Sequence, residues 1–444
     1  NAKIPRCRSH WELEEYTLAE NMRACTARGK EYSMDKKLRE TAETILHSAL
    51  RAVQPDAAVR RALENAAFPG RVCLVAVGKA AWQMAHAAYE TLGERISGGI
   101  VVTKYEHARS PIGPLRIREA GHPVADENSF AAAKEVLEMT AGLRADDTVL
   151  FLVSGGGSAL FELPLIEPAE QQEITRQLLA CGADIVEMNT IRKRLSAVKG
   201  GRFAQHCSPA HVFSIVLSDI IGDPLDMIAS GPAYPDASTE EQALEIVRKY
   251  DLRLSEQAMD CLRKPTPKAL SNVETHVTGS VRELCAAAMR EAEALGFRCQ
   301  MLTDCLCCQA KEAGNFLASV ARSHQDTGVP LAFLAGGETT VQLTGSGLGG
   351  RNQELALAAA PGISGLRQTA VFSFGSDGTD GPTDAAGGYA DQDTLAALQS
   401  AGWDAVQTLR DNDAYHALQA VGGLLMTGPT GTNVNDLAMV LIAR

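Results

Sequence analysis

The chain has 444 residues, which is longer than a single hydrophobic core usually supports, so two domains are expected. Hydrophobic residues make up 45% of it and charged residues 22%, as in an ordinary soluble globular protein, and no apolar run is long enough to cross a membrane. Its net charge of -12 argues against nucleic-acid binding as the main task.

Helical and strand patterns alternate along the first part of the chain. Met34 reads as a natural start, so residues 1–33 are interpreted as an N-terminal extension or an expression remnant. Continuous runs rich in β-branched residues, which are typical of strands covered on both faces, occur at 71–78, 98–103, 147–154 and 211–219. Helical periodicity occurs at 36–53, 79–92 and 129–143. This alternation predicts parallel βαβ units in a layered α/β domain.

A second α/β domain is expected after the segment KPTPKALSN at 264–272, which has two prolines and no periodicity. The residues that follow predict helices at 280–296, 309–322 and 352–360, strands at 298–303 and 368–374, and a last strand near the C-terminus. The run PLAFLAGGETTVQLTG, residues 330–345, predicts two strands joined by a turn that contains glycine. The predicted domains are therefore 34–268 and 269–444.

The eleven cysteines do not indicate a metal site. Cys305, Cys307 and Cys308 stand close together, but they lack the paired spacing and the histidines of a zinc site. They are interpreted as reduced thiols. A cytoplasmic location is expected, because no apolar secretion signal stands near the start.

Glycines gather where the predicted strands end. In open parallel sheets ligands bind outside the carboxyl ends of the strands, so these loops are the expected place of an active site. The segment SGGGS places Gly155, Gly156 and Gly157 between Ser154 and Ser158, which leaves backbone N–H groups unshielded and adds hydroxyl donors. This pattern indicates a cradle for an anion or a phosphate, with a tight turn as the alternative. It has neither the lysine of a P-loop nor the spacing of a dinucleotide fingerprint.

Two cationic residues stand at similar positions. Lys79 follows a predicted strand directly and begins a helix, among small and apolar neighbours. Arg351 follows two glycines and also begins a helix. A lysine in a cleft neutralises a carboxylate or a phosphoryl group, and an arginine binds either one through two hydrogen bonds. An ordinary surface ion pair is the alternative for each residue.

Two glycine-containing loops carry acidic residues, namely Asp219, Asp223 and Asp226 in the first and Asp377, Asp380 and Asp384 in the second. Carboxylates in such loops suit a hard cation such as Mg2+, or a general base for a substrate hydroxyl. Asp219 and Asp377 are the leading candidates for these roles. Aspartate also caps helices and stabilises turns, so a structural role is the alternative for each residue.

Ordered blocks of the sequence resemble one known family. They are VGKAAWQMA, GHPVADENS, LVSGGGSALFELP, MNTIRKRLSAVKGGRFA, LSDIIGDPLDMIASGPAYPD, GGETTVQLTGSGLGGRNQELALAAA, GSDGTDGPTDAAGG and TGPTGTNVNDLAMVLI, and they extend from about residue 35 to 444. On these blocks the chain resembles the class II glycerate 2-kinases. The resemblance implies a Rossmann-like, parallel-sheet N-terminal domain, a smaller α/β C-terminal domain of the MOFRL type, and an active site in the cleft between them.

The same resemblance implies a reaction and the residues that perform it. Members of the family phosphorylate D-glycerate with ATP, so ATP, Mg2+ and D-glycerate are the expected ligands, and a homodimer is an assembly to test. Lys79 and Arg351 match the essential cations of the family. Separately from the resemblance, the need for a residue that accepts the proton of the hydroxyl makes Asp377 the expected catalytic aspartate. Nucleotide and substrate contacts are expected at Ser154, Gly155, Gly156, Gly157, Ser158, Lys199, Glu338 and Asn352, and metal contacts at Asp219, Asp223 and Asp380.

Two other functions stay open as alternatives. Proteins that resemble this one are sometimes labelled hydroxypyruvate reductase, which would need a nicotinamide site, and the absent dinucleotide fingerprint argues against it. A non-catalytic metabolite sensor on the same fold would have lost its charged cleft residues, yet Lys79, Arg351 and the aspartates are present. Phosphoryl transfer needs positioning and charge neutralisation, and cations from two domains complete such a site only when the cleft closes.

Overall fold

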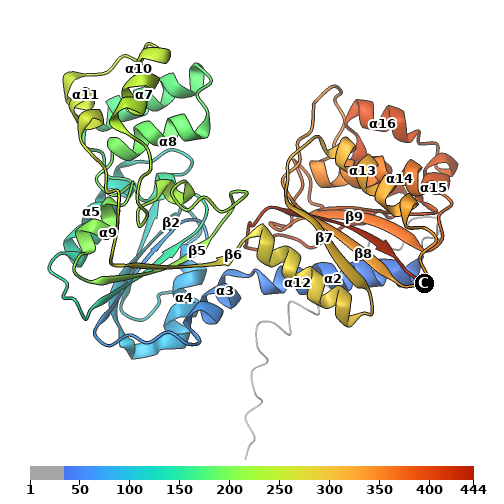
Figure 1. Ribbon diagram of the computed structural model, residues 1–444, viewed down its shortest axis with the longest axis horizontal. Coiled ribbons are helices and arrows are strands. Elements are labelled where there is room, and N and C mark those ends of the chain that lie inside the picture. The colour runs from blue at the N-terminus through green and yellow to red at the C-terminus, as the bar shows by residue number, and fades with distance from the viewer. Residues whose placement is uncertain (1–34) are drawn as a thin grey trace, which may run out of the picture.

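The computed structural model describes residues 35–444, so the predicted extension at 1–33 lies outside the described residues. Two sheets of six strands each form two lobes that stand side by side in Figure 1. Helices cover both sheets, which confirms the predicted α/β class with two domains. No helix within residues 35–444 is long and apolar enough to cross a membrane.

The first sheet is entirely parallel and has the strand order β3-β2-β1-β4-β5-β6. Its strands are β1 (Val72–Val77), β2 (Ile96–Lys104), β3 (Leu115–Ala120), β4 (Thr148–Val153), β5 (His211–Leu217) and β6 (Val273–Gly279). β1 and β4 are apolar runs that are buried at every position, as expected for central strands. The strand order reverses between these two neighbours, and ligands bind in the crevice at such a point.

Helices lie on both faces of the first sheet, because successive side chains of each strand point to opposite faces. Leu74 and Ala76 of β1 pack with α3 (Pro55–Leu63) and α4 (Ala81–Leu92), whereas Val75 and Val77 pack with α5 (Glu127–Thr140) and α9 (Arg202–Cys207). A separate apolar cluster joins α7 (Pro168–Ala180), α8 (Ile185–Arg194), α10 (Glu240–Lys249) and α11 (Glu256–Arg263) at the far end of the lobe (Figure 1). The shorter elements are α6 (Gly157–Leu160), η2 (Gly93–Arg95) and η3 (Ile228–Ser230).

The second sheet is mixed and has the strand order β11-β10-β9-β12-β8-β7. Its strands are β7 (Arg298–Leu306), β8 (Leu331–Gly337), β9 (Thr369–Gly375), β10 (Gly387–Asp391), β11 (Leu424–Leu425) and β12 (Asp436–Ile442). The helices of this lobe are α12 (Val281–Ala294), α13 (Ala310–Ser323), α14 (Arg351–Ile363), α15 (Thr394–Ser400), α16 (Ala405–Asp411) and α17 (Ala414–Ala420). β12 is antiparallel to both of its neighbours, so its first residues lie at the same edge as the last residues of β8 and β9.

The hairpin predicted at 330–345 is wrong. β8 ends at Gly337, and the residues after it leave the sheet as a loop, apart from an isolated bridge at Thr340. Because β8 already pairs with β7 on one side and β12 on the other, no edge is left for a hairpin partner. The loop instead carries Glu338 and leads to Arg351 at the start of α14.

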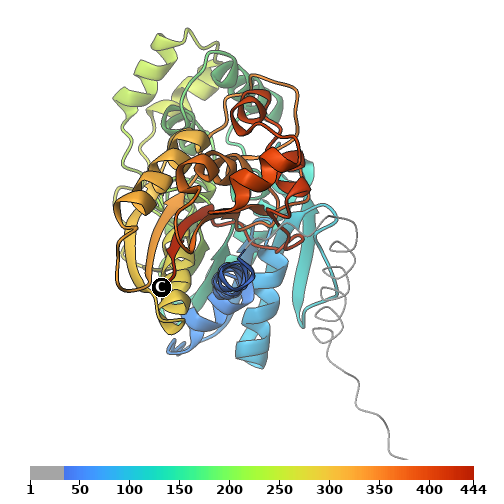
Figure 2. The same ribbon diagram turned by 90° about the vertical axis from the view of Figure 1, so that its right-hand side faces the viewer.

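The chain passes between the lobes twice. Its first described helix, α2 (Lys36–Ala52), packs with α12 against the second sheet before the chain enters the first lobe at α3. In Figure 1 α2 lies beside α12, and the turned view in Figure 2 shows the same blue helix nearly end-on. The chain returns after β6, which belongs to the first sheet. The predicted ranges were 34–268 and 269–444. Within the first range α2 packs in the second lobe, and within the second range β6 belongs to the first sheet.

Candidate active site

The turn after β1 and the loop after β4 are in direct contact where the strand order reverses. Lys79 N donates to Gly155 O at 2.9 Å, and Ala80 N donates to the Ser154 hydroxyl at 3.1 Å. Gly78 permits this approach, because its φ is +123° and a Cβ there would overlap Ser154. Backbone geometry thus holds together the two loops that the sequence predicts to share a site.

Lys79 is an exposed cation at this junction. Its ammonium group has no hydrogen bond or ion pair within residues 35–444, and its stem lies beside Gly156, where an added Cβ would be 3.3 Å from Lys79 Cγ. The ring of His122 covers the same glycine, 2.9 Å from that Cβ. Burial, and then the charges of Lys79 and Lys104, lower the pKa of His122, which keeps the ring neutral. The cation beside this loop is therefore available to a ligand anion.

The loop between β4 and α6 presents unused backbone donors. The N–H groups of Gly155 and Gly156 have no acceptor within the described part of the chain, whereas Gly157 N donates to Ser154 O at 3.3 Å. Gly156 has φ +85°, a conformation that residues with a Cβ rarely adopt. Because α6 has only four residues, the loop amides, and not a helix N-terminus, supply the positive field.

The serine hydroxyls of this loop are engaged within the protein. Ser154 is buried and accepts from Ala80 N, so it supports the turn, which differs from its predicted role as a donor to a ligand. Ser158 Oγ lies 3.1 Å from Ser230 Oγ, and Ser230 donates to Asn189 Oδ1 at 2.8 Å. Ser158 is only partly buried, so it is the better placed of the two serines to reach a ligand.

Lys199, which the family resemblance implies as a ligand contact, is fully buried under this loop. Its ammonium group donates to Ser158 O at 2.8 Å and to Phe161 O at 3.0 Å, and it pairs with Glu162 Oε2 at 2.9 Å. Burial lowers the pKa of Lys199, and the charge of Glu162 opposes that shift. With its N–H groups used in this way, Lys199 supports the loop from the protein interior, and its direct contact with a ligand stays a prediction.

Asn435 links the two lobes at the site. Its amide Nδ2 donates to the backbone oxygen of Asp219 at 3.1 Å in the first lobe and to Glu338 Oε2 at 3.3 Å in the second. Its φ is +65°, and strained conformations of this kind cluster at functional sites. The Asp219 carboxylate lies against Gly155, where an added Cβ would overlap it, and burial raises the pKa of Asp219. Asn435 therefore joins Glu338 of the second lobe to the segment of the first lobe whose Asp219 carboxylate faces Gly155.

Arg351 lies between two carboxylates of the second lobe. Its Nε and Nη2 donate to the two oxygens of Asp436 at 2.5 and 3.0 Å, and its Nη1 lies 3.1 Å from Glu338 Oε1. The hydrogen bonds that Arg351 donates to Asp436 raise the pKa of Arg351, so the guanidinium stays charged. Each terminal nitrogen of a guanidinium carries two N–H groups, so one on each remains for a further acceptor.

Asp380 and Asn352 hold the start of α14 in place. The Asp380 carboxylate accepts from Asn352 N at 3.1 Å and from Gln353 N at 2.8 Å, as a capping residue does. Asn352 is buried, and its amide spans Asp380 and Ser373. Burial raises the pKa of Asp380 to about 6. Both residues hold the helix end that carries Arg351, and their predicted contacts with metal or substrate stay predictions.

The other predicted acidic residues do not gather into one cluster. Asp377 is partly exposed at the end of β9, where its carboxylate and that of Asp436 flank Gly375. Asp223 lies toward the second lobe, where its charge acts on Arg282. No group of three or more His, Cys, Asp or Glu side chains in residues 35–444 is arranged to hold a metal. The predicted set of Asp219, Asp223 and Asp380 therefore does not form a preassembled metal site.

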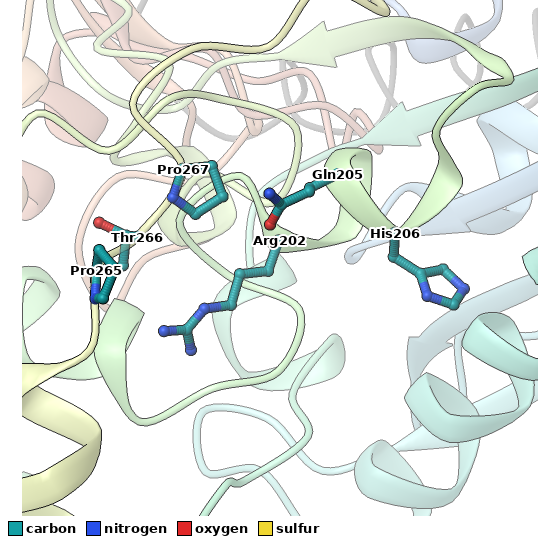
Figure 3. Close-up of a pocket in the computed structure, with 6 residues that line it drawn as sticks. All are labelled: Arg202, Gln205, His206, Pro265, Thr266 and Pro267. Atoms are coloured by element: carbon teal, nitrogen blue, oxygen red, sulfur yellow. The ribbon is translucent and has the colours of Figure 1, made fainter.

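A cavity of about 370 Å³ has a different lining. Its residues are Arg202, Gln205, His206, Pro265, Thr266 and Pro267 (Figure 3). Arg202 Nη1 donates to the backbone oxygens of Arg194 and Ser196, and in Figure 3 the His206 ring points away from the guanidinium. Because these polar groups do not converge, the strand-end loops are the better candidate for the site.

Sequence reasoning missed four residues of the site: His122, Glu162, Asn435 and Asp436. Each stands in a block that resembles the family, namely GHPVADENS, LVSGGGSALFELP or TGPTGTNVNDLAMVLI. Asn435 and Asp436 directly precede the apolar run of the last strand, and that position is a signal that could have found them.

Comparison with known families matches residues 41–263 to a domain of unknown function, DUF4147, and residues 331–436 to the MOFRL family. The chain is 51% identical to the D-glycerate 2-kinase of Thermotoga maritima over 413 residues, which cover 92% of this chain and 99% of that relative. The crystal structure of a glycerate kinase from Thermotoga maritima matches with a TM-score of 0.88 at 50% identity, covering 92% of this chain and 100% of that one.

Two further relatives cover nearly as much of the chain. The glycerate 2-kinase of Pyrococcus horikoshii is 38% identical over 433 residues, which cover 91% of this chain and 97% of the relative. A protein of Agrobacterium vitis with a provisional name as a hydroxypyruvate reductase is 38% identical over 424 residues, covering 92% of this chain and 95% of that relative.

Proposed function

The chain belongs to the glycerate 2-kinase family, and from this premise we propose that it transfers the terminal phosphoryl group of ATP to the 2-hydroxyl of D-glycerate between its two lobes. The comparisons confirm the resemblance found in the sequence. One observation carries the placement of the reaction: Lys79, without a protein partner, stands beside the unused N–H groups of Gly155 and Gly156. These groups lie where the order of a parallel sheet reverses, which is where such sheets bind ligands.

The phosphate oxygens of ATP would lie on the amides of Gly155 and Gly156, with the ammonium group of Lys79 beside them. Backbone donors and a lysine are the groups that proteins use for this purpose. Neutral His122 covers the same loop and adds no competing charge. Phosphoryl transfer requires placement and charge neutralisation more than covalent chemistry, and this loop provides both.

Arg351 would approach the transferring group from the second lobe. Asp436 and Glu338 fix its guanidinium, and the free N–H on each terminal nitrogen can serve an oxygen of the ligand. Lys79 and Arg351 then stabilise the developing charge from two lobes, so the arrangement is complete only when both lobes are in place. A site divided in this way limits hydrolysis of ATP in the absence of the acceptor.

Asp219 and Asp377 would divide the remaining roles. The Asp219 carboxylate lies against Gly155 and would hold Mg2+, since this ion is bound through one or two carboxylates together with substrate phosphates. Mg2+ at this point would neutralise phosphate charge. Asp377 is partly exposed and flanks Gly375 together with Asp436, and it would accept the proton of the glycerate 2-hydroxyl.

The direct experiment incubates the purified chain with D-glycerate, ATP and Mg2+ and identifies the product by its position of phosphorylation. The expected product is 2-phosphoglycerate, formed in step with ADP. Formation of 3-phosphoglycerate would correct the assigned hydroxyl, and no ADP formation above the rate without glycerate would reject the proposed reaction.

A hydroxypyruvate reductase is the second candidate, because the Agrobacterium vitis relative carries that name. The same preparation, given hydroxypyruvate and NADH without ATP, separates the two, since a reductase oxidises NADH and a kinase does not. A metabolite sensor would bind glycerate without turnover. A cytoplasmic location and a homodimer also belong to this proposal, and gel filtration with light scattering measures the assembly.

A further inference from the structure

Arg192 of α8 is a partly buried arginine without a hydrogen bond or an ion pair within residues 35–444. Its two neighbours along the helix are engaged. Lys193 pairs with Asp226 at 2.9 Å and with Asp236 at 3.3 Å, and the Arg194 guanidinium donates to Ser238 O at 2.8 Å. Of the three basic residues at the end of α8, Arg192 is therefore the one whose side-chain N–H groups have no acceptor within the described residues.

Arg192 lies on the face of α8 that is directed toward Ser158. Asn189, three residues earlier, accepts from Ser230, and Ser230 contacts Ser158 at 3.1 Å. Residues three apart on a helix lie on the same face, so Arg192 lies one turn along from this contact. Burial lowers the pKa of Arg192 and the charge of Glu162 opposes it, which is consistent with a place beside the end of α6.

Glu162 is not free to serve as the partner of Arg192. Its Oε1 accepts from Leu163 N at 2.9 Å, and its Oε2 pairs with Lys199 at 2.9 Å. Partial burial of a guanidinium without a partner costs free energy, and proteins keep such groups where a ligand supplies the opposite charge. The unpaired charge beside Ser158 therefore points to an anionic ligand group.

We infer that Arg192 binds the carboxylate of the acceptor substrate through two parallel N–H···O bonds, and this inference rests on the proposed function. The other cations of the site have different tasks: Arg351 is shared between Asp436 and Glu338, and Lys79 stands at the amides of Gly155 and Gly156. The carboxylate of glycerate is attached to the carbon that bears the reacting hydroxyl. It must therefore lie next to the loop at 154–158, where the phosphate groups of ATP are proposed to bind. Two cations stand at the Ser158 end of that loop, and Lys199 is already paired with Glu162, which leaves Arg192 for the carboxylate.

The test compares Arg192→Ala, Arg192→Lys and the wild type with D-glycerate and with its neutral amide, D-glyceramide. Loss of a bidentate arginine is expected to raise KM for D-glycerate about 10–100-fold in Arg192→Ala. KM for ATP and the constants for D-glyceramide should change less than about threefold, because neither ligand presents a carboxylate to Arg192. Arg192→Lys keeps the positive charge but cannot form two parallel hydrogen bonds to a carboxylate. Its KM for D-glycerate should therefore lie between that of the wild type and that of Arg192→Ala.

Arg248→Ala is the matched control, since Arg248 is an exposed arginine of α10 in the same helical group. If D-glyceramide is not turned over, its inhibition constant against D-glycerate gives the same comparison. If Arg192→Ala does not fold, the comparison is made between Arg192→Lys and the wild type. An equal loss for D-glycerate and D-glyceramide, or a rise confined to KM for ATP, overturns the inference. A wild type that does not phosphorylate D-glycerate rejects the proposed function itself, which is seen before any variant is assayed.

Discussion

The side-chain amide of Asn435 donates to the backbone oxygen of Asp219 at 3.1 Å, so one residue of the second lobe holds the loop after β5 of the first. Asn435→Asp would place a carboxylate against that oxygen and against Glu338. We expect kcat/KM for D-glycerate to fall about 10–100-fold, because lost hydrogen bonds and a new repulsion cost about 1–3 kcal/mol. Aspartate tolerates a positive φ, so backbone strain is not the cause.

Asn433→Asp is the control for this variant. Asn433 is exposed and uses its Oδ1, which aspartate retains, to accept from Asn435 N. The kcat/KM values of the two variants for D-glycerate, measured by steady-state kinetics, should therefore differ by at least tenfold. Similar losses at the two positions would show that added negative charge, and not the contact to Asp219, is responsible.

Lys79→Ala should separate activity from stability. The ammonium group has no partner within the described residues, so its removal should change the free energy of unfolding by less than about 0.5 kcal/mol. Removal of a cation that stabilises the transferring phosphoryl group should lower kcat about 100–1000-fold. Urea unfolding and the ATP-coupled assay measure the two effects, with Lys134→Ala, at an exposed position of α5, as the control. Near-normal turnover by Lys79→Ala would reject its assigned role.

Gly78→Ala and Gly142→Ala form a matched pair, because both glycines have a positive φ, +123° and +73°. Alanine at 142 meets nothing within 4 Å, so only the backbone cost of about 1–2 kcal/mol is expected. Alanine at 78 would also overlap Ser154, so we expect about 3 kcal/mol or more and a displaced Lys79. Thermal unfolding and kcat of the two variants check this, and equal costs would show that the turn can relax.

Lys199→Met should destabilise the protein. It leaves the buried Glu162 carboxylate without its cation, which costs about 3–5 kcal/mol in comparable buried pairs. Adding Glu162→Gln removes the unpaired charge, so the double variant should regain a large part of that loss. Urea unfolding of the single and double variants measures the coupling. A stable Lys199→Met with a raised KM would instead favour direct contact with a ligand.

Asp380 should make stability depend on pH. Its pKa is raised by burial to about 6 from 3.8, so the folded protein holds a proton that the unfolded chain releases. The stabilising contribution of this group is therefore full below about pH 4 and is lost as the pH rises through about 6, which amounts to about 3 kcal/mol.

Asp380→Asn cannot titrate, and this gives the measurement. The free energy of unfolding of the wild type, less that of Asp380→Asn, should fall by about 2–3 kcal/mol between about pH 4 and pH 7. A difference that stays constant over this range would place the pKa of Asp380 near its ordinary value.

The sequence was sufficient for those features that depend on local pattern. Buried β-branched runs followed by glycine predicted both the strands β1 and β4 and the meeting of Lys79 with the SGGGS loop. The features it could not predict depend on burial and on partners distant in the chain. Lys199 and Asn352 were expected to contact a ligand, whereas in the structure Lys199 pairs with Glu162 and Asn352 donates to Asp380.

The failed hairpin has the same kind of cause. The pattern of residues 338–345 suits a strand, but both edges of β8 are taken by β7 and β12, and β12 comes from the far end of the chain. The position of α2 against the second sheet could not be predicted either, because the pattern of an amphipathic helix does not specify which of two sheets it will cover. Long-range competition for partners, and not local preference, decided both outcomes.

The place of α2 has a consequence for biosynthesis. Its inward residues, Leu38, Ala42, Ile45, Leu46, Ala49 and Leu50, pack on α12 and on a sheet whose strand β12 ends at Ile442. A ribosome therefore releases this helix before any of the surface that receives it, and the whole first lobe emerges in between. In the nascent chain the apolar face of α2 therefore stays uncovered until β12 is made, and a product that terminates before β12 keeps that face exposed to chaperones and proteases.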